Sequence, residues 1–358
     1  MRLEPRRQPS GAALLLAPLA AIGFALLVTA LLVAWAGAPV GRTYALMLQG
    51  GFGSVFAWSE TLTRAVPLIL TGLAATVAFK ARLYNIGAEG QLYAGALAAV
   101  AVGGVPAGGE LAASVWLMFP LMLLAAAAAG AALLLVPALL KARLGVDEVV
   151  TTLLLNFIAL LGVSALLDGA MKDPAALGWP QSLALAGELE LTKLVPGTRV
   201  HSGLLLAAAL AVALSALFKY TLLGFQIRAT GANPRAAAFV GVPALRTTVI
   251  VALLSGALAG LAGAVEVAGR TGYVTLDMSP GYGYSGIVIA MLAALNPLGV
   301  LAAAIFIAGV LVGADSMSRA IGVPTYLADV IVATSLLCVL VATLFTQYRV
   351  RWREGSAM

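Results

Sequence analysis

Long apolar runs recur along the whole chain, and they constrain its fold more than any other feature of the sequence. Runs such as 12–36, 112–140 and 202–219 are each long enough to cross a hydrocarbon core of about 30 Å. Of the 358 residues, 62% are hydrophobic and 10% are charged, whereas about a quarter of the residues in a soluble domain are charged. A transmembrane β-barrel would instead show alternating segments of about ten residues. The sequence therefore predicts an all-α polytopic membrane protein.

Ten apolar runs are present, so the sequence predicts about ten transmembrane helices with both termini on one side. Placing the N-terminus inside leaves 14 of the 21 Lys and Arg residues in cytoplasmic segments, and this bias favours an N-in, C-in topology. Ten spans also permit two inverted five-helix halves, although no sequence repeat is visible. The predicted spans lie near 12–36, 62–79, 86–105, 112–140, 149–167, 202–219, 247–268, 284–296, 298–314 and 325–346.

The spans divide the chain into one membrane domain and three cytoplasmic segments. The membrane domain covers 12–346, between an N-terminal tail at 1–11 and a C-terminal tail at 347–358, and the largest cytoplasmic loop is 220–246. The first run exceeds the about 7–15 apolar residues of a signal peptide, so we expect an uncleaved first span. For 284–314 the sequence leaves open two full spans or a re-entrant hairpin, because two short runs flank the turn-forming sequence NPLG.

The largest cytoplasmic loop contains a short predicted helix with its own start and stop signals. Asn233 is a favourable N-cap, and Pro234 suits the first helical position. Arg235–Val240 includes three alanines, which favour helix, and Gly241 can end the helix in a left-handed conformation before Pro243. A helix of under two turns is marginal alone in water, so it needs a surface to pack on. It is either a capped connector or a docking helix for a cytoplasmic protein.

A polar stretch, NIGAEGQ (85–91), opens the third predicted span. It places Asn85, Glu89 and Gln91 at the cytoplasmic start of the third span. Glu89 can be stabilised simply by the positive end of its own helix, or by pairing with Lys80 or Arg82. Alternatively, the three polar side chains line a pathway for a solute, because ionisable groups within spans usually face a cavity.

A second polar cluster, DMSPGYGYSG, leads into the apolar run at 284–296. Its Tyr282 and Tyr284 are suited to an aromatic belt at the membrane interface, or to stacking on a planar ligand. Asn296 begins the turn that follows this run. We therefore expect these side chains either at an interface or along a solute pathway.

The seventh predicted span carries a pair of small residues and a carboxylate. Gly256 and Gly260 lie four positions apart, which favours close packing of helices. Glu266 lies near the outer end of the same span. Together with Glu89 it could supply the coupling carboxylates of an ion- or proton-coupled secondary transporter, and this class stays open as an alternative.

Several absent motifs narrow the function. The sequence has no G-x-x-x-x-G-K-[ST] motif, so the chain has no P-loop for ATP. His201 is the one histidine and Cys338 the one cysteine, so neither a metal cluster nor a disulfide framework is expected. The net charge of +6 is typical of cytoplasmic loops that retain Lys and Arg, rather than of nucleic-acid binding. The sequence therefore favours a transporter over an enzyme.

Four segments together resemble one family of transport proteins. They are LTGLAATVAFKARLYNIGAEGQLYAGALAA (70–99), GVDEVVTTLLLNFIA (145–159), GANPRAAAFVGVP (231–243) and GYGYSGIVIAMLAALNPLGV (281–300). In this order they resemble the permease subunit of bacterial ABC importers, in the branched-chain-amino-acid and ribose permease superfamily and its nucleoside and simple-sugar branch. The resemblance covers nearly all of the chain after about residue 60.

The resemblance implies an ATP-driven importer subunit that moves a nucleoside or simple sugar across the bacterial inner membrane by alternating access. It implies a second homologous permease, a cytoplasmic ATP-binding subunit that uses ATP and Mg, and an extracytoplasmic substrate-binding lipoprotein. This chain would bind no cofactor itself, and its loop helix would couple it to the ATPase. The predicted substrate-pathway residues are Asn85, Glu89, Gln91, Tyr282, Tyr284 and Asn296. The predicted coupling residues are Arg228, Asn233, Pro234, Arg235, Ala236 and Phe239.

Overall fold

A computed structural model gives the fold of two compact units, which are described separately. Unit 1 is Met1–Trp58 with Gly309–Met358, and unit 2 is Ser59–Ala308. Much of the first and last predicted spans lies outside the described residues. The structure describes residues 2–5, 23–24, 26–31, 33–35, 37–106, 108–322, 330, 332–334, 337–338, 341 and 348–351.

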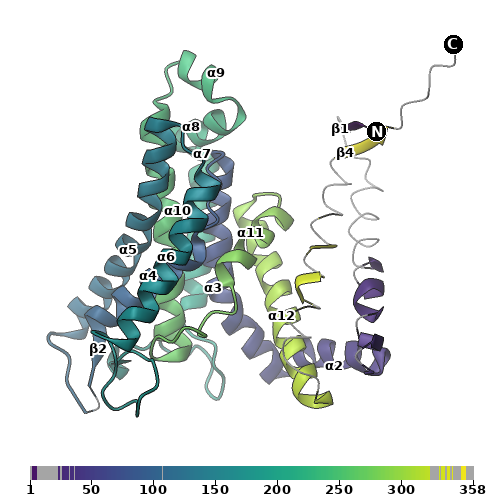
Figure 1. Cartoon of the computed structure of the whole chain (residues 1–358), viewed down its shortest axis with the longest axis vertical. Helices are drawn as coiled ribbons and strands as arrows, with labels where there is room; N and C mark the ends of the chain where they lie inside the picture. Colours follow the sequence, from purple (N-terminus) through teal and green to yellow (C-terminus); the bar gives the residue numbers. More distant parts are fainter. Residues whose placement is uncertain are drawn as a thin grey trace. The chain divides into compact units, whose positions relative to one another are not determined.

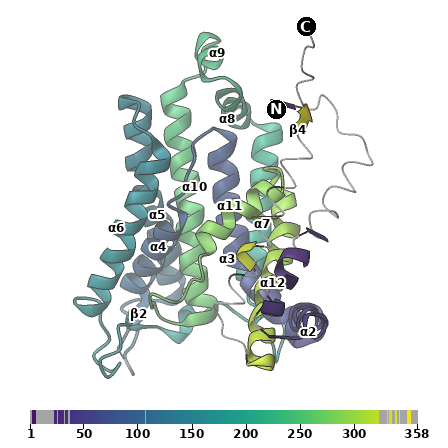
Figure 2. The ribbon, with the colours of Figure 1, turned by 45° about the vertical axis from the view of Figure 1, so that its right-hand side comes forward.

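The described part of the chain is mostly helical, and its long helices form the body of unit 2 (Figures 1 and 2). Two short strands, β2 (Gly104–Val105) and β3 (Ala184–Leu185), form an antiparallel pair. The 3₁₀-helix η1 (Gly187–Leu189) follows β3, and the π-helix η2 (Val267–Thr271) extends α10. The α-helices are α2 (Val40–Phe52), α3 (Val55–Lys80), α4 (Ala88–Gly103), α5 (Val115–Leu144), α6 (Glu148–Asp168), α7 (Gly203–Tyr220), α8 (Leu222–Ala232), α9 (Pro234–Phe239), α10 (Ala244–Glu266), α11 (Tyr282–Leu292) and α12 (Pro297–Ile321).

Within the described residues, six helices are long and apolar enough to cross a membrane. They are α3, α5, α6, α7, α10 with η2, and α12. A seventh span is present if Leu26–Trp35 and Val40–Phe52, which are bent by 116°, count as one. The apolar runs expected in these places are thus confirmed as helices of spanning length.

Two of the predicted spans form helices that are shorter than a full membrane crossing. The run at 86–105 forms α4, whose 16 residues are about 24 Å long. The run at 284–296 forms α11, whose 11 residues are about 17 Å long. Both fall short of a hydrocarbon core of about 30 Å. In the region 284–314, α11 is thus shorter than a span, whereas 298–314 lies within the 25-residue α12, which is long enough to cross.

The short helix α11 begins deep in unit 2 and runs alongside α3. The Thr71 hydroxyl donates to the Tyr282 carbonyl at 2.9 Å. One turn later, a Cβ added to Gly286 would lie 2.7 Å from the Thr71 side chain. At the end of α3, Lys80 and the turn after α11, including Asn296, line one cavity. The irregular segment 272–281, after η2, therefore enters the bundle. Helix α11 continues from there towards the end of α3.

Helix α4 lies at the centre of unit 2, in contact with α5, α6 and α10. Glycines allow its backbone and that of α5 to approach α10 closely. A Cβ at Gly95 would lie 2.1 Å from the Gly260 carbonyl oxygen, and one at Gly130 would lie 2.2 Å from that of Gly256. These distances leave no room for a side chain at either contact. The close packing predicted from Gly256 and Gly260 is therefore confirmed.

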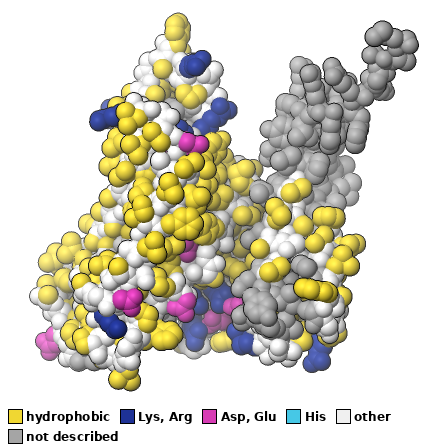
Figure 3. Space-filling view, viewed as in Figure 1, with side chains coloured by type: hydrophobic (Ala, Val, Ile, Leu, Met, Phe, Trp, Pro, Cys, Tyr) yellow, Lys and Arg dark blue, Asp and Glu magenta, His cyan; other side chains and the backbone are white. Residues whose placement is uncertain are grey.

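The outward faces of the bundle are apolar, as a lipid environment requires. On α6, Leu154, Ile158 and Leu161 are exposed, and on α5 so is Trp116. These positions recur every three or four residues, so they form a continuous stripe on α6. Figure 3 shows hydrophobic side chains over much of the visible surface of the helices. In water such a surface would favour aggregation, whereas in a bilayer it meets acyl chains.

The two ends of unit 2 differ in their connections. One end, here called the α9 end, carries the C-termini of α3, α5 and α7 and the helices α8 and α9. The other, here called the β2 end, carries β2, β3 and η1 (Figure 1). Figure 3 shows dark-blue basic side chains around α9. Basic residues in the segments of the α9 end are Lys80, Arg82, Lys141, Arg143, Lys219, Arg228, Arg235 and Arg246.

Unit 1 is held together by close contact between α2 and the C-terminal part of α12. A Cβ at Gly51 would lie 2.4 Å from the Gly309 carbonyl oxygen, and one at Gly313 would lie 2.2 Å from that of Met47. The two tails also meet in this unit. Strand β1 (Arg2–Pro5) pairs with β4 (Tyr348–Arg351) in antiparallel register.

Candidate functional site

Glu89 lies where the N-termini of two helices meet. It belongs to the first turn of α4, and its Oε2 accepts a hydrogen bond of 2.6 Å from the backbone N–H of Gly283 in the first turn of α11. Gly281, with φ +86°, turns the chain into α11. A Cβ on Gly283 would lie only 2.2 Å from the Glu89 nitrogen. The buried carboxylate therefore faces the positive ends of two helix dipoles.

Pairing of Glu89 with Lys80 or Arg82, one of the contacts considered for it, is not among the ion pairs of the described residues. The Lys80 ammonium instead lies 4.7 Å from the centre of the Phe218 ring. The backbone carbonyl of Arg82 accepts a hydrogen bond from Lys141 at 2.5 Å. The physical reason is depth: the chain between α3 and α4 descends into the bundle, so that Ile86 N–H bonds to Thr152 Oγ1, one turn inside α6.

Asn85 and Gln91 form a closed pair of carboxamides. Each donates to the carbonyl oxygen of the other at 2.9 Å. Asn85 also donates to Ser255 Oγ at 3.3 Å, and Ser255 donates to the Ala74 carbonyl at 2.8 Å. These bonds join α3, α4 and α10. Both amides are buried, so in this conformation they tie helices together, and their role in a pathway stays a prediction.

Asn156 of α6 connects α4 to α11. Its Oδ1 accepts from the Gly90 N–H, and its Nδ2 donates to the Tyr284 hydroxyl. A side chain at position 90 would block this approach, because a Cβ there would lie 2.9 Å from Asn156 Oδ1. Tyr284 is held by its hydroxyl while 39% of its surface stays exposed. Its ring is therefore fixed in position and accessible from outside unit 2.

Tyr282 lies on the opposite side of α11 and is fully buried. Its hydroxyl accepts from Arg270 Nη1 at 3.2 Å. The same nitrogen is 2.5 Å from Glu266 Oε1. The π-helix η2 carries Arg270, and such single π-turns are frequent at functional sites. Glu266 is thus neutralised by an ion pair, and Tyr282 serves this buried network instead of an aromatic belt.

The structure brings most of the predicted pathway residues together, but not all of them. Glu89 and Tyr284 are linked through the contacts of Gly90, Asn156 and Gly283. The pair Asn85 and Gln91 is adjacent, because both belong to the segment that enters α4. Asn296 is separate. It is exposed at the α9 end, where its Oδ1 accepts from the Leu298 N–H at 3.0 Å and caps α12.

Sequence reasoning missed two residues of this arrangement. Asn156 is a single carboxamide in the apolar run at 149–167, and a polar residue within a span is by itself a signal of function. Arg270 follows Glu266 by four positions, which is the spacing of a helical ion pair. The structure gives Asn156 contacts to two other helices and gives Arg270 contact with both Glu266 and Tyr282.

The helix predicted in the largest loop is confirmed as α9. Asn233 Oδ1 accepts from the N–H groups of Arg235 and Ala236, each at 3.1 Å. Pro234 occupies the first turn, and Gly241 has φ +85°. The structure adds the 11-residue helix α8, which the sequence did not suggest. Figures 1 and 2 show α8 and α9 together at one extremity of unit 2.

Helix α9 has one inward side chain and several outward ones. Ala237 is buried, whereas Phe239 is 92% exposed and Val240 is also exposed. Helix α8 is anchored by Gly231, where a Cβ would lie 1.9 Å from the Lys80 carbonyl oxygen. An apolar side chain exposed to this extent on a well-anchored element is typical of a surface that another protein covers.

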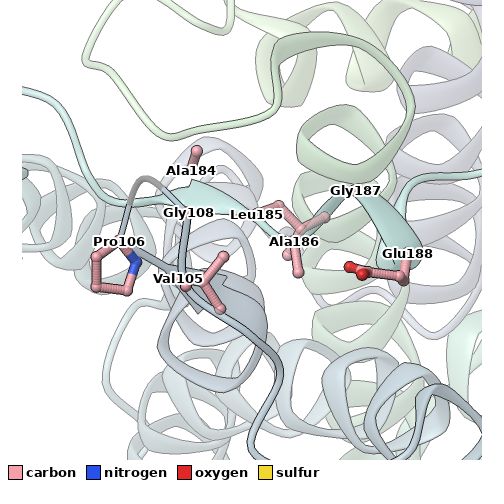
Figure 4. Close-up of a pocket in the computed structure, with 9 residues that line it drawn as sticks. Val105, Pro106, Gly108, Ala184, Leu185, Ala186, Gly187 and Glu188 are labelled. Carbon is pink, nitrogen blue, oxygen red and sulfur yellow. The ribbon is translucent and has the colours of Figure 1, made fainter.

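A cavity of about 580 Å³ opens at the β2 end (Figure 4). It lies between the β2 loop, with Val105 and Pro106, and the segment from Ala184 to Glu188. Most of its lining is backbone and small side chains, and Glu188 contributes a carboxylate. None of the predicted pathway residues lies in this cavity. Among the described residues, no group of three or more His, Cys, Asp and Glu could hold a metal ion.

Comparison with known protein families decides what these features belong to. The family described as branched-chain amino acid transport system / permease component matches residues 57–340. The chain belongs to this family. Its members are permease subunits of ABC transporters, which cross the membrane several times and work with a separate ATPase and a substrate-binding partner. The ion- or proton-coupled secondary transporter, kept open above, is therefore wrong for this permease.

Individual relatives match along most of their length. The permease is 38% identical to the glucose ABC transporter permease protein TsgB13 of Haloferax volcanii, over 86% of this chain and 82% of that one. It is 35% identical to the guanosine ABC transporter permease protein NupP of Bacillus subtilis, over 96% of both chains. It is 30% identical to the nucleoside ABC transporter permease protein NupB of Lactococcus lactis, over 91% and 90%.

Proposed function

We propose that this permease imports a nucleoside, with a simple sugar as the second candidate. The observation that carries the proposal is the similarity to a guanosine permease over 96% of both chains. A second nucleoside permease is 30% identical. The sugar candidate rests on the 38% identity to a glucose permease, which spans less of both chains.

The geometry around Tyr284 suits a nucleoside. A partly exposed tyrosine ring, oriented through its hydroxyl by Asn156, offers a face on which a planar base can stack. Glu89, behind Tyr284, holds the start of α11 and so supports the position of this ring.

The proposed assembly combines two similar permeases, a lipoprotein and an ATPase. Two similar permeases, of which this chain is one, would form the pathway between them in the bacterial inner membrane. A lipoprotein would deliver the solute from outside, and an ATPase would bind ATP and Mg on the inside, so this chain needs no cofactor of its own. The pathway would include the exposed face of α11 with Tyr284. Closing and opening of the ATPase would switch it between outward and inward access.

Two features support an N-in, C-in topology with the α9 end in the cytoplasm. Eight basic residues belong to the segments of the α9 end of unit 2, as the excess of positive charge on the cytoplasmic side requires. In unit 1, β1 pairs with β4, and this pairing of the two tails is what a topology with both tails on one side would need. The membrane domain would extend over 12–346, with tails at 1–11 and 347–358, and an even number of crossings. An arrangement as two inverted halves of five segments would count α4 and α11 as members.

Helices α8 and α9 form the proposed coupling element. The exposed residues Arg235, Ala236, Phe239 and Val240 would enter a groove of the ATPase, while Asn233 and Pro234 fix the start of α9. Substituting Ala236→Glu or Phe239→Glu should lower transport without changing the amount of folded permease. Ala237→Glu serves as a comparison, because Ala237 is buried and this change should unfold α9 itself.

Uptake of radiolabelled guanosine by cells with and without this gene tests the substrate. The proposal predicts that deletion abolishes uptake, and that unlabelled adenosine competes whereas glucose and leucine do not. Competition by glucose alone would favour the sugar candidate. In a strain without other guanosine transporters, guanosine uptake that is unchanged by the deletion would contradict the proposal.

A further inference from the structure

A second cavity, at the α9 end, is lined by basic side chains from three helices. It has a volume of about 270 Å³. Lys80 is the last residue of α3, Lys219 lies in the last turn of α7, and Arg228 lies in the middle of α8. The turn between α11 and α12 completes the wall with Asn296 and Pro297. This cavity is distinct from the surroundings of Glu89 and Tyr284.

The charge of this basic cavity is not balanced by the protein. Its wall contains three cations and no Asp or Glu. In the part of the chain that the structure describes, the ion pairs join Lys141 to Glu148, Arg199 to Glu60 and Arg270 to Glu266, and none involves the cavity. The first turn of α12 adds the positive end of a long helix beside Pro297. Such a convergence of positive charge, with hydroxyl and amide donors from Ser215 and Asn296, fits a phosphate group.

The helix next to the basic cavity indicates where the phosphate comes from. The exposed side chains of α7 form an apolar stripe through Leu205, Val212 and Ala216, at helical spacing. This stripe ends in Lys219 and Tyr220, and the Lys219 ammonium lies 5.1 Å from the centre of the Tyr220 ring. An apolar face that ends in an exposed tyrosine and lysine is typical of the boundary between acyl chains and headgroups.

The geometry points to a binding site for the phosphate of an anionic phospholipid headgroup in the basic cavity. The phosphodiester lies among Lys80, Lys219 and Arg228, and the acyl chains follow the exposed face of α7. The site rests on the proposed function only in placing the α9 end at the inner surface of the membrane, where anionic lipids attract basic residues. It is independent of the transported solute.

Native mass spectrometry of the full-length permease, purified in a neutral detergent with its accompanying subunits, tests the site. The probes are phosphatidylglycerol and phosphatidylcholine, titrated separately. We expect phosphatidylglycerol to bind more tightly, and the double variant Lys80→Gln/Lys219→Gln to weaken its binding about 30-fold, from the loss of two cations near an anionic headgroup. Equal binding of the two lipids, or equal phosphatidylglycerol binding by the variant, would overturn the site.

A matched variant separates the site from general charge. Lys172→Gln/Lys193→Gln removes two lysines from the connection between α6 and α7, at the β2 end, and should leave phosphatidylglycerol binding unchanged. A melting curve checks folding. If the double variant at the cavity does not fold, the single change Lys219→Gln, at an exposed position, replaces it and should weaken binding about fivefold.

Competition identifies the source of the phosphate. An excess of inorganic phosphate should leave phosphatidylglycerol bound, because a lipid also gains from its acyl chains. If inorganic phosphate displaces the lipid and binds alone, the phosphate site stands and the lipid source is overturned. If the cavity variant keeps its lipid but loses the ATPase during purification, the cations serve a protein contact and the proposal is wrong. None of these readouts depends on guanosine uptake, so failure of the substrate proposal is recognised separately.

Discussion

The Oε2 atom of Glu89 lies 2.6 Å from the backbone nitrogen of Gly283, a residue 194 positions later in the chain. This bond joins the first turn of α4 to the first turn of α11. Both helices are shorter than a hydrocarbon core of about 30 Å, and both begin inside the bundle. Interrupted helices of this kind are how transporters place polar backbone groups near the middle of a membrane. Both helices direct the positive ends of their dipoles to this point, and the carboxylate of Glu89 lies there.

Removing the Glu89 side chain should destabilise this junction. We expect Glu89→Ala to lower stability by about 1–3 kcal/mol, because the Gly283 N–H would be left buried without an acceptor. Uptake should fall as well. Glu89→Gln keeps an acceptor and loses only the charge, so its effect should be smaller, about 0.3–1 kcal/mol. Melting curves of the purified variants measure both changes, and equal effects of the two substitutions would contradict a role for the bond.

Gly283 should tolerate no side chain. A Cβ there would lie 2.2 Å from the Glu89 nitrogen, so Gly283→Ala must push α11 away from α4. We expect a loss of about 1–3 kcal/mol or more and little uptake. Gly162 is the matched control: it lies within α6, and a Cβ there would meet nothing within 4 Å. Gly162→Ala should be neutral or stabilise the helix by up to about 1 kcal/mol. Similar melting temperatures for the two variants would show that the close approach is not required.

The ring of Tyr284 should matter more for transport than its hydroxyl. If a nucleoside base stacks on it, Tyr284→Ala should raise the KM for uptake about three- to tenfold, the equivalent of one aromatic contact. Tyr284→Phe keeps the ring and should change KM less. Tyr84→Ala removes a tyrosine of similar exposure, 42% compared with 39%, at the α9 end and should leave KM unchanged. An equal increase of KM for Tyr84→Ala and Tyr284→Ala would argue against stacking at Tyr284.

His201 should make the permease less stable in mild acid. It lies before α7 and outside the spanning helices, against Gly269. Burial lowers the pKa of His201 from 6.5 to about 4, so the folded state keeps the ring neutral. Between these values the unfolded state binds more protons than the folded state. Stability is therefore full above about pH 6.5 and falls as the pH decreases towards 4, by about 3 kcal/mol at most.

Melting temperatures across this pH range measure the effect of His201. The wild-type permease should lose stability between pH 6.5 and 4, whereas His201→Asn, which cannot titrate there, should lose less over the same interval. Parallel curves for the two proteins would show that other groups cause the acid sensitivity. The control matters because many carboxylates titrate in the lower part of the range.

Sequence patterns predicted the parts of the molecule that depend on nearby residues. The start of α9 follows from Asn233 and Pro234, because an N-cap bonds to groups two or three positions away. The close packing of α10 follows from the spacing of Gly256 and Gly260, although its partners α4 and α5 do not. The long apolar runs predicted the membrane class, because crossing a bilayer requires only length and hydrophobicity.

Tertiary structure decided the features that depend on residues far apart in the chain. An apolar run cannot reveal where α4 and α11 begin, because Glu89 in the first turn of one bonds to Gly283 in the first turn of the other. Nor can it separate Tyr284, exposed and bound to Asn156, from the buried Tyr282, bound to Arg270. The sequence by itself therefore determined the membrane class, most of the long helices and the capped loop helix. Only the fold determined which polar side chains meet, because each of these contacts joins segments whose separation the chain alone does not specify.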